Sequence, residues 1–259
     1  MKVTVLGCGT SVGVPVIGCD CAVCTSDEPR NQRLRCGLRL ETEVNGEART
    51  VLIDTPPDLR QQALRFGIDR VDAVVYTHGH ADHTFGIDEL RIFNFLRDGP
   101  IPCYAQPETV ERLQTNFAYV FEPPRKEGGG KPRLEMHEIG TSSFEVCGLE
   151  FQPVPLLHGS TNVLGFRLGR FAYLTDCNHI PEGSFSLLDG VELLIIDALR
   201  FGPPHSTHFT VAEAIGAARR IGARRTWLTH MNHDIDYREP AEALPPGVEL
   251  AYDGLTIGL

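Results

Sequence analysis

The six residues 78–83 carry the densest set of chemically active side chains in the sequence. They read His-Gly-His-Ala-Asp-His, which places three imidazoles and one carboxylate in a single turn. An apolar, β-branched run at residues 71–76 precedes them and predicts a buried strand. The carboxyl end of such a strand is where α/β sheets usually form their sites. Imidazole and carboxylate donors together favour Zn, Mn or Fe, and the mixture indicates two adjacent ions.

Four further polar residues each follow an apolar run that predicts a strand. They are His158, Asp176, Asp197 and His230. Any one of them alone would usually be a loop or capping residue. Because strands of one sheet end at a shared edge, we expect the four to gather beside residues 78–83. The sequence therefore predicts a metal centre assembled from distant segments.

A second cluster consists of three thiols within six residues, Cys19, Cys21 and Cys24. Thiolates at this spacing suit one structural Zn, but a tetrahedral site needs a fourth ligand. Cys8, Cys36 and His233 are the candidates for that position, and the residues alone leave the choice open. Cys103, Cys147 and Cys177 lie in or beside predicted strands, where we expect buried apolar side chains.

Two histidines, His205 and His208, precede a predicted helix at residues 210–221 that begins with a capping box. The positive field of a helix N-terminus disfavours an imidazolium unless an anion lies nearby. A phosphate group would supply that anion. Either histidine is therefore a candidate proton donor to a phosphate ester.

The predicted strands and helices must position these candidate side chains. Predicted strands cover residues 3–6, 36–43, 49–54, 101–105, 133–138, 144–146, 150–154, 163–168, 171–174, 192–197 and 225–229, with two short strands near the C-terminus. Predicted helices cover residues 57–66, 88–96 and 108–119, and residues 122–132 form a Gly- and Pro-rich insertion. Two sheets with helices outside them is the natural layering of such a chain.

Composition narrows the class of protein. The 259 residues carry a net charge of −10, which disfavours a long nucleic acid as partner. No apolar run is long enough to cross a membrane, and the N-terminus resembles a strand rather than a signal peptide. We therefore expect a cytoplasmic protein, where the eight cysteines are not a disulfide framework.

In chain order, the His-x-His-x-Asp-His turn, the distal His, the Asp and the final His resemble the metallo-β-lactamase superfamily of binuclear hydrolases. The resemblance implies a single domain over residues 1–259, an α/β four-layer αββα sandwich with two mixed sheets and outer helices. It also implies one ion on His78, His80 and His158, a second on Asp82, His83 and His230, with Asp176 bridging them. Asp54 matches a position that orients ligand histidines in that family.

The sequences Gly-Cys-Asp-Cys-Ala-Val-Cys (residues 18–24) and Thr-His-Met-Asn-His (residues 229–233) resemble the subgroup that includes the carbon–phosphorus lyase accessory phosphodiesterase. That resemblance implies a structural Zn on Cys19, Cys21, Cys24 and His233, with Cys36 as the alternative to His233. It also favours His208 over His205 as the proton donor.

The implied function is hydrolysis of a small, cyclic phosphodiester such as a 2′,3′-cyclic nucleotide or a cyclic ribose phosphate. Two Zn or Mn ions would activate water, with Asp82 and His208 as the residues most directly involved in catalysis. The alternatives are a thioesterase or lactonase of the same fold, or a non-catalytic accessory protein of cofactor biosynthesis. A homodimer is also compatible with the resemblance.

Overall fold

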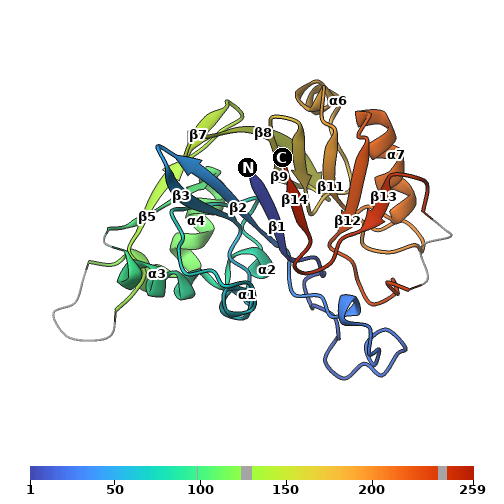
Figure 1. The fold of residues 1–259 in the computed structure, drawn as a ribbon, viewed down its shortest axis with the longest axis horizontal. Coiled ribbons are helices and arrows are strands. Elements are labelled where there is room, and N and C mark those ends of the chain that lie inside the picture. The colour runs from blue at the N-terminus through green and yellow to red at the C-terminus, as the bar shows by residue number, and fades with distance from the viewer. Residues whose placement is uncertain (98, 124–129, 239–243) are drawn as a thin grey trace.

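The computed structural model describes residues 1–97, 99–123, 130–238 and 244–259. Within these ranges the strands form two seven-stranded sheets of mixed direction. The centre of the insertion predicted at residues 122–132 lies outside the described residues. Figure 1 shows one sheet in each half of the molecule, with the N- and C-termini close together between them.

The first sheet has the order β14-β1-β2-β3-β4-β5-β6. Its strands are β1 (Lys2–Gly7), β2 (Gly37–Val44), β3 (Glu47–Ile53), β4 (Ala73–Val75), β5 (Ile101–Ala105), β6 (Leu134–Glu138) and β14 (Thr256–Gly258). The hairpin between β2 and β3 turns at Asn45 and Gly46, both with positive φ, as an Asn-Gly turn predicts.

The second sheet has the order β13-β12-β11-β10-β9-β8-β7. Its strands are β7 (Phe144–Val146), β8 (Leu149–His158), β9 (Thr161–Leu168), β10 (Phe171–Leu174), β11 (Leu193–Asp197), β12 (Arg225–Thr229) and β13 (Val248–Leu250). The strands β10 to β13 run parallel, so their carboxyl ends meet at one edge.

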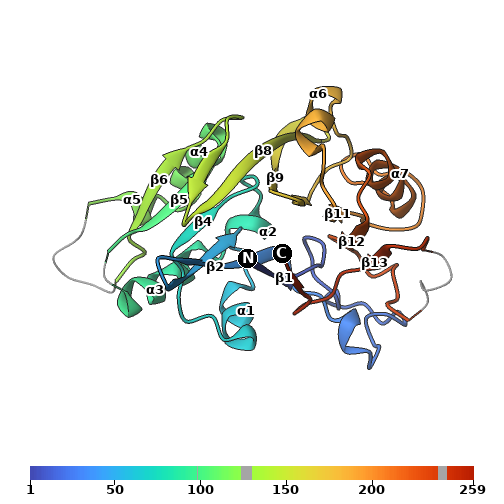
Figure 2. The ribbon, with the colours of Figure 1, turned by 45° about the horizontal axis from the view of Figure 1, so that its top comes forward.

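Most of the helices lie on the outer sides of the two sheets, whereas the short α2 lies centrally, between the sheets (Figure 2). They are α1 (Leu59–Phe66), α2 (Ala81–Thr84), α3 (Leu90–Leu96), α4 (Pro107–Asn116), α5 (Ala118–Phe121), α6 (Glu182–Phe185) and α7 (Val211–Ile221). Short 3₁₀ turns occur at Pro29–Asn31, Ile87–Glu89 and Ser186–Leu188. The predicted αββα layering is confirmed.

The side chains of β3 show how the layers of the fold pack together. Val51 and Ile53 face the large core between the two sheets, whereas Leu52 faces a smaller core with α1, α3 and α4. Successive side chains of a strand point to opposite faces, so a continuous apolar run can serve two cores at once. All three side chains are completely buried.

Several predicted boundaries were wrong in detail. The helix predicted at residues 108–119 is divided, because the backbone of Phe117 leaves the helical region between α4 and α5. The helix predicted at residues 88–96 begins with a 3₁₀ turn before α3. The capping box at Thr210 and Glu213 is confirmed at the start of α7. Among the described helices, none combines the length and the apolar character that crossing a bilayer requires.

Candidate metal centre

Three residues of the centre occupy an unusual backbone conformation within two positions of a strand end. Asp54 follows β3, Asp176 follows β10, and His230 follows β12, with φ values of 66°, 53° and 59°. Residues other than glycine rarely adopt this left-handed backbone conformation. Its energetic cost is tolerated mainly at functional sites. The sharp turn at each strand end directs these side chains toward the edge between the two sheets.

The predicted ligands form two groups that share Asp176. One consists of His78, His80, His158 and Asp176, and the other of Asp82, His83, Asp176 and His230. Within each group the potential ligand atoms lie within 4.8 Å of one another. The Oδ1 atom of Asp176 lies 3.2 Å from Nε2 of His83, and its Oδ2 lies 3.2 Å from Nε2 of His230. The geometry thus brings together every residue that the sequence suggested for the two ions.

Hydrogen bonds orient the histidine rings from outside. Nδ1 of His83 donates to Asp54 Oδ2 across 2.7 Å, and Nδ1 of His158 donates to the carbonyl of Thr207 across 2.7 Å. The Thr77 hydroxyl donates to Asp54 across 2.8 Å, which leaves its oxygen to accept from His78 Nδ1 at 3.0 Å. Each of these rings therefore presents Nε2 to the centre, as metal-binding histidines do when their other nitrogen is held.

The inner nitrogens fit a bound cation. The Nε2 atoms of His78, His83 and His230 are buried and have no hydrogen-bond partner among the described residues. Burial lowers the pKa of His78, His80 and His158. Nearby carboxylates instead raise the pKa of His83, and raise that of His230 to about 9, so the centre holds negative charge that attracts a cation. Buried nitrogens without partners are costly, so a divalent ion in each group would satisfy them.

His208 lies beside this centre and His205 lies farther out. Nδ1 of His208 donates to Asp197 Oδ2 across 2.9 Å, and its ring stacks on His230 with centroids 4.4 Å apart. The His158 ring centroid is 4.6 Å away. His205 is instead turned toward Thr207, whose hydroxyl lies 3.2 Å from its Nδ1. Of the two histidines, His208 is therefore the better placed candidate for the proton donor.

Asp197 belongs to neither of the two ligand groups that share Asp176, although its place at a strand end predicts a position in the metal centre. Its partner is instead His208, eleven positions along the chain in a loop of irregular structure. Asp197 also accepts from the backbone N–H of Cys177 across 2.9 Å. No local pattern links an aspartate to a histidine in a later loop, so only the fold could identify the pair.

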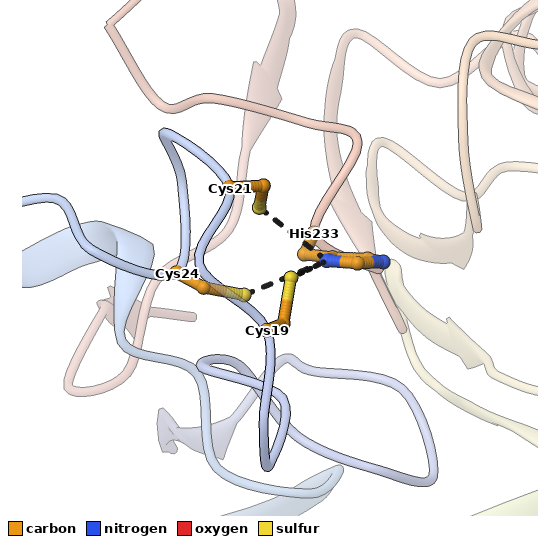
Figure 3. Close-up of side chains that lie close together, drawn as sticks. All are labelled: Cys19, Cys21, Cys24 and His233. Carbon is orange, nitrogen blue, oxygen red and sulfur yellow. Dashed lines mark hydrogen bonds between the residues drawn. The ribbon is translucent and has the colours of Figure 1, made fainter.

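The cysteine cluster closes around His233 (Figure 3). The sulfurs of Cys19, Cys21 and Cys24 lie 3.2, 3.5 and 3.5 Å from its Nδ1. Two ligands about 2.3 and 2.1 Å from a tetrahedral Zn are about 3.6 Å apart, so this set fits such an ion. A hydrogen bond from the backbone N–H of Cys24 is the main cause that lowers the pKa of Cys21 to about 6, toward the thiolate form.

Cys36, the alternative candidate for the fourth ligand, lies outside this cluster. Its sulfur is buried, 3.5 Å from the carbonyl of Gly9 and 3.6 Å from the Thr229 hydroxyl. Burial raises the pKa of this thiol to about 12, and its position away from the other three sulfurs excludes it from the cluster. Cys103 and Cys177 are buried as predicted, whereas Cys147 is half-buried.

Sequence comparison supports the family. A model described as "Beta-lactamase superfamily domain" matches residues 49–231. A Porphyromonas gingivalis protein named octanoyltransferase is 36% identical over 257 residues, which cover 98% of this chain and 51% of that protein. The chain therefore spans about half the length of this relative.

Comparison with solved structures agrees with the match to the family model. The crystal structure of a new diphosphatase from the PhnP family matches with a TM-score of 0.90 and 43% identity, over 99% of this chain and 96% of that one. Zn²⁺-bound PqqB from Methylobacterium extorquens matches with a TM-score of 0.76 and 22% identity over the full length of both chains, which shows the fold alone. The chain belongs to the β-lactamase superfamily, and its fold and site are those of a metal-dependent hydrolase.

Proposed function

We propose that the chain is a two-metal phosphodiesterase that hydrolyses a small phosphodiester. The observation that carries this proposal is the position of His208, held by Asp197 and stacked on the ligand His230. An alkoxide is a poor leaving group and needs a proton donor, whereas a thiolate, with a thiol pKa of about 8.5, leaves without one. A histidine placed beside the metal ligands therefore favours phosphate esters over thioesters.

Two divalent ions, Zn or Mn, would supply positive charge that lowers the pKa of a water and stabilises charge on the phosphoryl oxygens. The residues of the chain then have distinct tasks. Asp176 is shared by both ligand groups and keeps them together. Asp197 accepts from Nδ1 of His208, which holds the ring with Nε2 toward the centre. The proton on Nε2 passes to the departing oxygen.

The comparisons support phosphorus–oxygen chemistry. The relative with 43% identity over nearly the whole of both chains is a diphosphatase. Diphosphates and phosphodiesters are both attacked at phosphorus and both expel an oxygen, so one arrangement of ions and proton donor serves either. A cyclic phosphodiester, such as a 2′,3′-cyclic nucleotide or a cyclic ribose phosphate, remains our leading substrate class. We further propose that the cysteine cluster holds one structural Zn.

The second candidate is hydrolysis of an acyl thioester. It is favoured by the likeness to the Porphyromonas gingivalis octanoyltransferase. An octanoyl chain needs an apolar cavity, however, and the cavity of about 390 Å³ beside His78 and His80 is lined by hydroxyl, amide and charged side chains. The surroundings of the centre therefore suit a polar substrate better than an acyl chain.

The test compares substrates and variants under one set of conditions. Metal-loaded protein is assayed on bis-p-nitrophenyl phosphate, 2′,3′-cyclic AMP and an octanoyl thioester. We expect metal-dependent turnover of the phosphodiesters that is lost in Asp82→Ala and retained in the control Asp69→Ala, whose side chain is exposed on the loop after α1. Thioester turnover without phosphodiester turnover would replace the proposal with the second candidate. Full metal content with no turnover of any substrate would favour an accessory protein.

A further inference from the structure

A polar cavity opens directly beside the metal centre. Its walls are the turn at residues 78–80, the start of β9 and one face of α4. The lining residues of α4 are Glu108, Thr109, Glu111, Arg112, Thr115 and Asn116, which follow the spacing of one helical face. No aromatic side chain other than the two ligand histidines lines this cavity. This cavity therefore offers a nucleobase no aromatic surface for stacking other than those two histidines.

Arg112 occupies the part of this wall nearest the ligand histidines. Its side chain lies across Gly79, the residue between His78 and His80. A Cβ atom at position 79 would lie 2.8 Å from Cδ of Arg112, closer than such atoms approach in proteins, and 3.3 Å from its Cβ, a tight contact. The backbone of Gly79 does not require glycine for its φ angle. The absence of a side chain at position 79 instead leaves room for the aliphatic part of Arg112 to pack against the turn.

Arg112 is exposed to the cavity and solvent, and its guanidinium makes no hydrogen bond or ion pair within the described parts of the chain. Glu108 stands four positions earlier on α4, the spacing at which exposed charged pairs form on a helix. No ion pair joins the two residues, because the stem of Arg112 is directed onto Gly79 instead. An unpaired cation beside a centre that binds divalent cations is repelled by them, and a bound anion would remove that repulsion.

We propose that Arg112 is a specificity-determining residue that binds a second anionic group, on the part of the substrate that is not cleaved. The inference rests on the proposed function and adds the chemistry of the substrate's other end. A guanidinium forms two parallel hydrogen bonds with a phosphate or a carboxylate, so either group satisfies it. Glu108 and Glu111 line the same wall and repel anions, so acceptance of such a group depends on Arg112.

The kinetic test uses p-nitrophenyl phosphodiesters that differ only in the alcohol that is retained. The retained groups are alkyl chains of two to four carbons ending in methyl, carboxylate or phosphate. We expect Arg112→Ala to lower kcat/KM for the preferred charged diester by at least about tenfold, mainly through KM. Turnover of the methyl-ended diesters should stay within about twofold. Arg112→Lys should recover part of the loss, since it keeps the charge but not the paired donors.

The matched control is Arg219→Ala, which removes an exposed arginine from α7 and should change neither class of substrate. Equal losses on charged and uncharged diesters would overturn the inference, since Arg112 would then act on the centre or the fold. Equal turnover of both classes by the unmodified protein would also overturn it.

A binding measurement separates this inference from the proposed function. Calorimetry compares propylphosphonate with 3-phosphonopropionate, which adds a carboxylate, on the metal-loaded protein. We expect tighter binding of 3-phosphonopropionate, and loss of that preference in Arg112→Ala. If no diester is hydrolysed but the preference persists, only the proposed reaction fails. If the two ligands bind equally, the inference fails whatever the turnover.

Discussion

Asp54 accepts a hydrogen bond from Nδ1 of His83 across 2.7 Å, and both side chains are completely buried. The same carboxylate also accepts from the backbone N–H and the hydroxyl of Thr77, each across 2.8 Å. One aspartate at the end of β3 thus fixes both the His83 ring and the start of the turn that carries three further candidate ligands. It has no place in either ligand group, so its effect on the ions is indirect.

Asp54→Asn should weaken the centre without removing a ligand. The amide keeps the size of the carboxylate but lacks its charge, so it accepts less strongly from His83. Loss of such a supporting partner typically costs about 10- to 100-fold in metal affinity or activity. Metal content after dialysis and kcat/KM would measure the change, with Asp69→Asn on an exposed loop as control. Unchanged metal retention would contradict the role assigned to Asp54.

His208→Ala should reduce phosphodiester turnover by about 10²- to 10⁴-fold, the usual contribution of a positioned proton donor. Metal content should not change, because His208 belongs to neither of the two ligand groups that share Asp176. Asp197→Asn should cause a smaller loss of the same kind, since the ring would no longer be held in one tautomer. His205→Ala is the matched control. A larger loss in His205→Ala than in His208→Ala would reverse the assignment.

The effect of His208→Ala should also depend on the leaving group. A p-nitrophenolate leaves readily without a proton, whereas an alkoxide does not. The loss should therefore be larger for 2′,3′-cyclic AMP than for bis-p-nitrophenyl phosphate. Equal losses on both substrates would argue for binding of the phosphate by His208 rather than proton donation.

Cys24→Ser should remove about one equivalent of Zn and leave the metals of the catalytic centre in place. The serine hydroxyl is a poor Zn ligand, and three ligands hold the ion far less firmly than four. The midpoint of thermal unfolding should fall as well, because the cluster links the N-terminal loop to His233 across more than 200 residues. Total metal analysis with calorimetry measures both effects. Cys147→Ser, at a half-buried thiol outside the cluster, is the control, and equal zinc content in the two variants would refute the site.

Asp253 should make the free energy of unfolding depend on pH. Burial raises the pKa of this carboxyl from 3.8 to about 6. The folded state therefore binds the proton more tightly than the unfolded chain does, so the stabilisation is complete below about pH 4 and is lost as pH rises through about 6. The difference amounts to roughly 3 kcal/mol.

The check is a comparison of wild type with Asp253→Ala by urea unfolding between pH 4 and pH 7.5. Comparing two proteins cancels the contributions of other titrating groups. The stability of the wild type relative to the variant should fall across this range. The backbone N–H groups of Cys8 and Leu34 donate to Asp253, so the variant will be less stable at every pH, but a constant difference would show that the pKa is not raised.

Much of the metal centre was predictable because its pattern is local or recurs at strand ends. Residues 78–83 hold four candidate ligands within one turn, and His158, Asp176 and His230 each end an apolar run. Strand direction then requires that such ends meet. The two-sheet layering was predictable for the same reason, since alternation along strands such as β3 requires an apolar layer on each side.

Other features depended on contacts between distant segments. The choice of His233 over Cys36 follows from which side chain reaches Cys19, more than 200 residues earlier, and not from spacing. The pairing of Asp197 with His208 and the position of Arg112 against Gly79 likewise depend on how loops and α4 pack on the strand edge. By itself the sequence determined which chemical groups are present and that they gather at one edge. Only the tertiary structure decided which outer groups orient them and which face of α4 lines the cavity beside the centre, because those contacts depend on packing rather than on a repeating local pattern.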